Sequence, residues 1–214
     1  MAEDLSDYRK SYDKSELTID QSDQDPFEQF KTWFEEVEAV AGVEEVNAMT
    51  VATIGLDGFP KSRVVLLKSY DEEGFVFYTN YQSEKGKALA ANPDVCLSFF
   101  WPNLERQVII KGKAEKVTEE TSTTYFNSRP EGSRLGAWVS PQSDVIPGRE
   151  FLEERLKRLE EEFAEKEIPK PDHWGGYKVI PVEFEFWQGR PNRLHDRLRY
   201  TPGGVHWKLE RLAP

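Results

Sequence analysis

Cysteine and histidine are scarce in this 214-residue chain, and their scarcity excludes several kinds of site. Cys96 is the single cysteine, so the chain has no intrachain disulfide framework and no thiolate metal site, and a reducing setting is expected. It lies in the apolar run "VCLSFFW", which favours inert packing over nucleophilic chemistry. The histidines, His173, His195 and His206, show no HxxxH or HxH spacing, so we expect no metal site.

Long apolar runs and an excess of basic residues are also missing. No stretch approaches the roughly 18 apolar residues of a membrane span, and "MAEDLSDYRK" has no apolar signal-peptide segment. The 39 acidic and 28 basic residues give a formal charge of −11, which argues against binding to nucleic acid or to anionic membranes. We therefore expect a cytoplasmic protein in which a local group of cations holds any anionic ligand.

Several common catalytic motifs are absent as well. The sequence contains no GxGxxG, no GxxxxGK(S/T), no GxSxG and no HExxH. Dinucleotide-binding folds, P-loop nucleotidases and serine hydrolases therefore lose their main support.

Aromatic residues are plentiful, with 13 Phe, 8 Tyr and 6 Trp in a chain that is 38% hydrophobic. This composition supports a sizeable core, and we expect a single domain over residues 25–214. Residues 1–24 are polar and carry few large aliphatic side chains, so we expect a flexible N-terminal arm. A disordered tail is the simpler alternative to any role for Arg9 and Tyr12.

Helix signals recur along the chain. Asp25 and Pro26 mark the start of one helix and Gly42 its end. Its expected apolar stripe consists of Phe27, Phe30, Phe34 and Val37. Further helices are expected after the capping residues Ser83 and Thr118, over 133–139, and in the amphipathic stretch "REFLEERLKRLEEEFAEKE".

The remaining ordered segments have strand character. β-rich runs predict strands over 48–54, 61–70, 75–80, 95–101, 106–117, 177–188, 193–200 and 205–212. Tight connections between the first three favour an antiparallel meander. Because the strands do not alternate regularly with helices, a parallel Rossmann-type sheet is disfavoured. The expected fold class is mainly β with peripheral helices (α+β), as a barrel with helices packed outside.

Cationic residues in apolar surroundings are the candidates for chemistry. "RVVLLK" carries Arg63 and Lys68 at its ends; strict alternation puts them on opposite faces of a strand, and solvent exposure is the simpler interpretation. "YFNSRPEGSR" joins Tyr125, Arg129 and Ser133. Hydroxyls beside a guanidinium suit a phosphate, while capping and surface roles are the alternative.

The segment "FWQGRPNRLHDRLRY", residues 186–200, concentrates cations in an acidic chain. Its members Arg193, His195, Arg197 and Arg199 are two apart, so an extended strand would place all four on one face. Buried without an anion, Arg193, His195 and Arg197 would repel one another. A phosphate or a polarised heterocycle would relieve that repulsion, and a solvent-facing strand is the alternative.

Ordered sequence blocks resemble a known family. "FEFWQGRPNRLHDR" resembles the C-terminal signature of pyridoxamine 5'-phosphate oxidases. "SRVVLLKSYDEEGFVFYTNYQSEKGKALAANP", "LERQVIIKGKAEKV", "YFNSRPEGSRLGAWVSPQS", "HWGGY" and "RLAP" resemble other blocks of that family in the same order, across residues 26–214. The resemblance implies an FMN-binding split β-barrel that works as a homodimer, with a C-terminal segment serving dimerisation and the substrate site.

The activity implied by the resemblance is oxidation of pyridoxamine 5'-phosphate and pyridoxine 5'-phosphate to pyridoxal 5'-phosphate. FMN would be the cofactor, and oxygen would be reduced to hydrogen peroxide. Two alternatives stay open at this point. One is a related split-barrel flavoprotein with another substrate, and the other is a non-catalytic protein that binds FMN or pyridoxal phosphate.

Site residues also follow from the resemblance, motif by motif. The implied FMN contacts are Arg63, Val64, Val65, Leu66, Leu67, Lys68, Tyr78, Thr79, Lys85, Gln107, Gln142, Ser143, Trp187 and Arg197. The implied substrate contacts are Arg9, Tyr12, Lys68, Tyr125, Arg129, Ser133, Arg193, Leu194 and His195, with Arg193 and His195 as the catalytic residues. Glu84 departs from the pattern, because many relatives carry Arg there, and the departure removes one possible phosphate contact.

Overall fold

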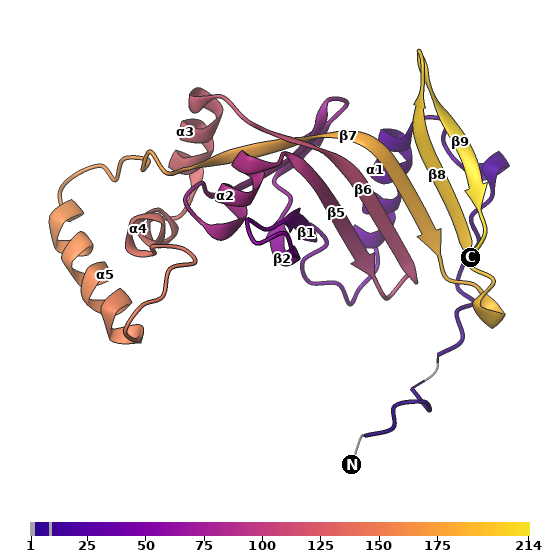
Figure 1. Ribbon diagram of the computed structural model, residues 1–214, viewed down its shortest axis with the longest axis horizontal. Helices are drawn as coiled ribbons and strands as arrows, with labels where there is room; N and C mark the ends of the chain where they lie inside the picture. Colours follow the sequence, from indigo (N-terminus) through magenta and orange to yellow (C-terminus); the bar gives the residue numbers. More distant parts are fainter. Residues whose placement is uncertain (1–2, 9) are drawn as a thin grey trace. The chain divides into compact units, whose positions relative to one another are not determined.

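A computed structural model describes residues 3–8 and 10–214 of the chain (Figure 1). This part of the chain contains five α-helices and two short 3-10 helices. The α-helices are α1 (Pro26–Glu38), α2 (Glu84–Ala91), α3 (Glu119–Ser128), α4 (Glu131–Val139) and α5 (Arg149–Phe163), and the 3-10 helices are η1 (Ile19–Gln21) and η2 (Pro191–Arg193). None of the helices in this described part is long and apolar enough to cross a membrane.

Nine strands form one sheet in the same part of the chain. They are β1 (Ala48–Ile54), β2 (Pro60–Leu66), β3 (Ser69–Asp71), β4 (Gly74–Asn80), β5 (Asp94–Trp101), β6 (Arg106–Lys116), β7 (Trp174–Gln188), β8 (Asp196–Gly203) and β9 (His206–Leu212). Hydrogen-bonded neighbours follow the order β2-β1-β5-β6-β7-β4-β3, and β8 pairs with β7 and β9. The expected class, mainly β with peripheral helices, matches this architecture.

The described residues group into two compact units. Unit 1 is the described part of Met1–Thr50 together with Leu97–Lys111 and Pro181–Pro214, and unit 2 is Val51–Cys96 together with Gly112–Ile180. Each unit has its own apolar core and its own group of candidate functional side chains.

Aromatic side chains from the helix α1 and from strands build the core of unit 1. Phe30 packs edge-on against Phe99 with ring centroids 5.1 Å apart, and Trp33 packs against Phe186 at 5.2 Å. Asp25 caps α1 by accepting the N–H of Phe27, with Pro26 in the first turn, as expected from the sequence. Of the expected apolar stripe, Phe30 and Val37 are buried, whereas Phe27 and Phe34 are only partly buried, and Trp33, which was not expected in it, is buried.

The core of unit 2 lies where α3, α4 and β7 meet. Phe126, Leu135, Ile168 and Trp174 are buried there, and α5 contributes partly buried Leu156, Leu159 and Phe163. β7 pairs antiparallel with β4, so that Gly176 lies opposite Tyr78. A Cβ atom at Gly176 would meet the Tyr78 ring at 2.9 Å, which explains why glycine is required beside this tyrosine.

Two of the strand predictions were wrong in detail. The run 61–70 is broken at Leu67 and Lys68 into β2 and β3; β2 pairs with β1, and β3 pairs with β4. The predicted meander is therefore confirmed only in part: the first run pairs with the second through β1 and β2, and the second with the third through β3 and β4, but β2 itself does not pair with β4. The run 193–200 also begins late, because Asn192 and Arg193 adopt left-handed backbone angles, with φ of 58° and 62°. β8 starts only at Asp196, so Arg193 and His195 do not share a strand face with Arg197 and Arg199.

Candidate functional site

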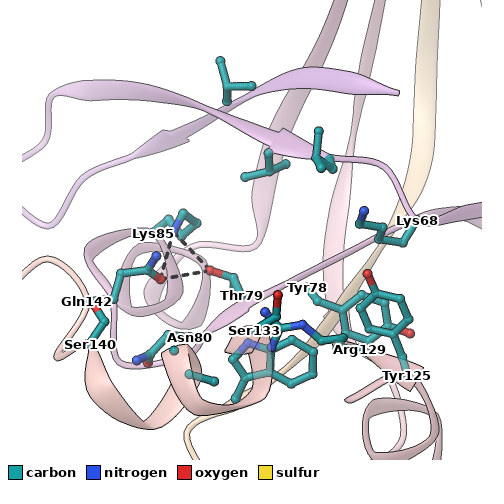
Figure 2. Close-up of a pocket in the computed structure, with 16 residues that line it drawn as sticks. Lys68, Tyr78, Thr79, Asn80, Lys85, Tyr125, Arg129, Ser133, Ser140 and Gln142 are labelled. Carbon is teal, nitrogen blue, oxygen red and sulfur yellow. Dashed lines mark hydrogen bonds between the residues drawn. The ribbon is translucent and has the colours of Figure 1, made fainter. Parts of the chain in front are cut away.

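A cavity of about 430 Å³ in unit 2 is lined by side chains from β2, β4, α2, α3, α4 and β7 and from nearby loops (Figure 2). Many residues expected at the site line it: Val64, Val65, Leu66, Lys68, Tyr78, Thr79, Lys85, Tyr125, Arg129, Ser133 and Gln142. The sequence prediction missed Asn80, Gly136, Ala137, Ser140 and Trp174. Of these, Trp174 belongs to the "HWGGY" block and was therefore within reach of a motif argument.

A second cavity of about 360 Å³ shares Lys85 with the first. Its lining is polar and charged: Lys61, Ser62, Arg63, Glu84, Lys85 and Ser143. Arg63 and Ser143 were expected at the site, whereas Lys61, Ser62 and Glu84 were not expected to line it. Leu67 lines neither cavity, because its side chain is buried with 4% exposure.

The ammonium of Lys85 lies at one end of the larger cavity, in the first turn of α2. It is buried, and it donates to Thr79 Oγ1 at 3.1 Å and to Gln142 Oε1 at 3.3 Å (Figure 2). Burial lowers the pKa of Lys85, and the Arg63 guanidinium lowers it further. Among the described residues no carboxylate pairs with this ammonium; its partners are neutral oxygens.

Arg63 adds a second cation beside Lys85. Its Nη1 donates to Thr53 Oγ1 at 2.8 Å and to two main-chain carbonyls, those of Val51 and Lys61. Burial lowers the pKa of Arg63 as well. Because α2 begins at Glu84 with Ser83 as its cap, the positive end of the helix dipole adds to this charge. Buried cations without a bound carboxylate are costly, so an anion is the expected occupant.

The guanidinium of Arg129 forms a second cationic group in the same cavity (Figure 2). Its Nη1 is buried without a hydrogen-bond partner in the described structure, and burial lowers the pKa of Arg129. The guanidinium lies over the Trp174 ring, 4.7 Å from its centroid. Pro130 follows directly, so Arg129 is extended, with φ of −75° and ψ of 147°, and α3 ends there. Ser133 then enters the cavity from α4.

An aromatic wall connects these groups. Tyr78 stacks on Tyr125 with centroids 3.9 Å apart and on Trp174 at 5.4 Å, with interplanar angles of 19° and 11°. Burial raises the pKa of the Tyr78 hydroxyl, and Tyr125 raises it further. Lys68 is exposed and projects from the link between β2 and β3 into the space next to this wall (Figure 2). The cavity can therefore accept a flat ring whose phosphate reaches a cationic group.

Unit 1 holds the other expected residues, which form a second group. His195 lies between Trp187 and Tyr12, with ring centroids 4.7 and 5.8 Å away. Its Nδ1 accepts the N–H of Arg190 at 3.1 Å, so in the neutral ring Nε2 carries the proton and can donate it. Arg193 and Leu194 are exposed next to it, and the exposed fraction of Leu194 is 68%.

Arg197 and Arg199 on β8 differ from the cations of the unit 2 cavities because each is paired with a carboxylate. Arg197 Nε donates to Glu185 Oε1 at 2.8 Å, which raises its pKa, and Nη1 donates to the carbonyl of Ala213 at 2.8 Å. Arg199 pairs with Glu210 at 3.0 Å. The charges of Arg197 and Arg199 are thus balanced by carboxylates on the neighbouring strands β7 and β9.

Gln107 and Arg9 are the remaining residues that the sequence predicted for the site. Gln107 is half-buried, and its Nε2 lies 3.4 Å from Ser98 Oγ. Arg9 lies outside the residues that the structure describes. Within 3–8 and 10–214, no group of His, Cys, Asp and Glu could hold a metal ion.

Comparison with known proteins gives consistent matches over the whole chain. Residues 35–162 match the family model described as pyridoxamine 5'-phosphate oxidase. Residues 174–214 match the model of the pyridoxine 5'-phosphate oxidase C-terminal dimerisation region. The chain is 66% identical, over 211 residues, to a pyridoxine/pyridoxamine 5'-phosphate oxidase from Flavobacterium johnsoniae, covering 98% of this chain and 99% of that protein.

Further relatives agree with this assignment. A protein of the same name from Flavobacterium psychrophilum is 64% identical over 212 residues, covering 99% of each chain. Among solved structures, PhzG from Burkholderia lata 383 in complex with tetrahydrophenazine-1-carboxylic acid is similar, with a TM-score of 0.87 and 30% identity. That match covers 96% of this chain and 100% of the other. These neighbours confirm the split β-barrel fold class. The family model and the full-length relatives together show that the chain belongs to the pyridoxamine 5'-phosphate oxidase family, a family of oxidoreductases.

Proposed function

We propose that the protein oxidises pyridoxamine 5'-phosphate and pyridoxine 5'-phosphate to pyridoxal 5'-phosphate, with FMN as cofactor and oxygen as the electron acceptor. The observation that carries this proposal is that one cavity with an aromatic wall contains two separate cationic groups. One group includes Lys85, and the other includes Arg129. Both proposed ligands are phosphate monoesters of flat ring systems. Each cationic group would therefore receive one phosphate.

The residues present fit FMN. The buried ammonium of Lys85 has only neutral partners among the described residues, and Arg63 beside it donates only to neutral oxygens. A phosphate would supply the missing negative charge. Val64, Val65 and Leu66 would line the ring with apolar surface, and Gln142 and Ser143 would hydrogen-bond to the cofactor.

The substrate would be held at the opposite group of residues. Arg129 Nη1, which lacks a hydrogen-bond partner in the described structure, would donate to the substrate phosphate. Ser133 and Tyr125 would add hydroxyl groups, and Lys68 a further positive charge. In this arrangement binding energy from the phosphate would orient the pyridine ring for reaction.

When bound, FMN supplies the redox chemistry by accepting two electrons from the substrate and delivering them to oxygen. With the amine substrate, oxygen and water are consumed, and pyridoxal 5'-phosphate, ammonia and hydrogen peroxide are formed. His195 would donate from Nε2 or move a proton, because its Nδ1 is occupied by the N–H of Arg190. The exposed guanidinium of Arg193 would stabilise charge that develops on the substrate.

We also propose that the active form is a homodimer. The support is the match of residues 174–214 to a C-terminal dimerisation region, because these residues include Trp187, Arg193, His195 and Arg197. In such a dimer the segment that carries His195 and Arg193 would also form part of the subunit interface.

Two other functions compete with the proposed oxidation of the phosphorylated vitamers. The first is oxidation of another flat substrate, and the relative that supports it is PhzG, whose structure holds a phenazine carboxylic acid. The second is storage of FMN or pyridoxal phosphate without turnover. The 66% identity to a protein named pyridoxine/pyridoxamine 5'-phosphate oxidase favours oxidation of the phosphorylated vitamers over both rivals.

The test is a set of spectra and rates on the purified full chain. We expect a flavin absorbance spectrum that bleaches when pyridoxamine 5'-phosphate is added without oxygen. We expect hydrogen peroxide and pyridoxal 5'-phosphate to appear in equal amounts when oxygen is admitted. A bound flavin that neither vitamer reduces would refute the proposed function and leave the two rivals.

A further inference from the structure

The residues that line the smaller cavity carry an excess of positive charge. Three cations line it, Lys61, Arg63 and Lys85, together with one carboxylate, that of Glu84. The lining therefore carries a formal charge of +2. A phosphate monoester carries about −1.5 to −2 near neutral pH, so one such group would neutralise the cavity.

Lys61 reaches this cavity from β2, and its side chain is 33% exposed. Its ammonium pairs with Glu84 and, at 3.0 Å, with Asp57 Oδ2. Hydrogen bonds to these carboxylates, Glu84 first, raise the pKa of Lys61. The ammonium is therefore charged at every physiological pH and lies next to the two cations that lack a bound carboxylate.

Glu84 occupies the first position of α2, at the positive end of the helix. Its main-chain N–H donates to Ser143 Oγ at 3.2 Å, which ties the helix start to the loop after α4. Its carboxylate acts on all three cations. It contributes to the raised pKa of Lys61, and it partly offsets the lowering of the pKa values of Arg63 and Lys85 by burial. Glu84 thus provides the negative charge that the lining otherwise lacks.

We propose that Lys61 is a phosphate-binding residue of this cavity and that the phosphate competes with the Glu84 carboxylate for its ammonium. The proposal rests on the proposed function, because the phosphate in question is that of FMN. Lys61, on β2, adds a third cation to the lining beside Arg63 and Lys85. Glu84 holds the Lys61 side chain at the cavity until the phosphate arrives, and it lowers the affinity for the phosphate by its own charge.

An ordinary surface ion pair provides the contrast. Lys113 pairs with Asp94 at 2.7 Å, but both side chains are exposed, at 60% and 65%, and neither lines the cavity that holds Arg63 and Lys85. Such pairs contribute little, because water and salt screen them. Lys113→Gln is therefore a matched control for Lys61→Gln.

The experiment compares two flavins that differ only in the phosphate. The full chain, freed of flavin, is titrated with FMN and with riboflavin, and the dissociation constants are read from flavin fluorescence. The variants are Lys61→Gln, Glu84→Gln, both together, and Lys113→Gln. Circular dichroism checks that each variant is folded.

We expect Lys61→Gln to weaken FMN binding roughly 3- to 30-fold, the range between an exposed ion pair and a charge-assisted hydrogen bond. Riboflavin binding should stay within about twofold, since it has no phosphate to lose. Glu84→Gln should tighten FMN binding about threefold and leave riboflavin unaffected. Lys113→Gln should change neither constant.

The decisive comparison is Lys61→Gln in the Glu84→Gln background, where the cavity lining keeps no carboxylate; the other partner of Lys61, Asp57, does not line the cavity. If FMN binding weakens there and riboflavin binding does not, Lys61 contacts the phosphate. If the FMN constant is unchanged in that background, or if both flavins change equally, the proposal is overturned. A failure of the proposed function looks different, because the unaltered chain would then bind no FMN or would not be reduced by either vitamer.

Discussion

Replacement of Arg129 by Gln is the sharpest test of how the cavity recognises its substrate. The guanidinium has an Nη1 that is buried without a partner in the described structure, and it lies over Trp174. If this group binds the substrate phosphate, the substitution removes a charge-assisted hydrogen bond. Such bonds contribute about 1.5–3 kcal/mol, which corresponds to a loss of roughly 10- to 150-fold in kcat/KM.

The fold should tolerate this change. The cation–π contact with Trp174 contributes about 0.5–2 kcal/mol, and its loss is partly offset because a desolvated charge is removed. The free energy of unfolding should therefore fall by no more than about 1 kcal/mol, and FMN binding should be unchanged.

The assay uses pyridoxamine 5'-phosphate and its unphosphorylated counterpart, pyridoxamine, with formation of the aldehyde product followed by absorbance. The unaltered chain should prefer the phosphorylated substrate, and Arg129→Gln should remove most of that preference. Arg134→Gln is the matched control, because Arg134 also has a buried Nε without a partner in the described structure but does not line the cavity. Equal losses for both substrates, or an unchanged preference, would refute the assignment of Arg129 to the phosphate.

Four further predictions follow from the same contacts. Lys85→Met should weaken FMN binding at least tenfold without lowering the free energy of unfolding of the flavin-free chain, because a buried cation with neutral partners is lost; isothermal titration and urea denaturation test this. His195→Ala should reduce turnover and leave the FMN dissociation constant unchanged, and loss of flavin with normal turnover of the loaded fraction would contradict its catalytic role. Glu105→Ala should speed tryptic cleavage within residues 10–18, since Glu105 Oε2 accepts the N–H groups of Asp13 at 2.9 Å and Lys14 at 3.2 Å. Burial raises the pKa of Tyr177 to about 12, so the unfolded chain releases this proton first as pH rises above 10. Stability should therefore fall by about 2 kcal/mol between pH 10 and pH 12, and Tyr177→Phe should reduce that fall in alkaline denaturation curves.

Local signals predicted most of the secondary structure. Asp25, Ser83 and Thr118 cap α1, α2 and α3 as expected, each by accepting a main-chain N–H. These predictions succeed because capping and periodicity depend on residues within one turn of each other. The division into an arm over 1–24 and one domain over 25–214 stays a prediction.

Local sequence signals could not predict the order of the strands in the sheet or the partner of each strand. A continuous meander of the first three runs would place β2 between β1 and β4, whereas β4 lies between β7 and β3 in the sheet. Pairing depends on which distant segment offers a matching edge and face, and no local pattern encodes that choice. The left-handed turn at Asn192 and Arg193 was missed for a related reason, because side-chain spacing says nothing about backbone angles.

By itself, the sequence determined the fold class, the positions of the helices, and the family blocks that name the candidate site residues. Only the tertiary structure decided which of their cations are available to a ligand. Arg197 and Arg199 are paired with Glu185 and Glu210, and β8 lies antiparallel to both β7 and β9, which carry those carboxylates. Lys85 and Arg129 meet no carboxylate among the described residues and lie in one cavity. The reason is physical: a residue's type and spacing fix its charge, but its burial and its partners depend on segments far away in the chain.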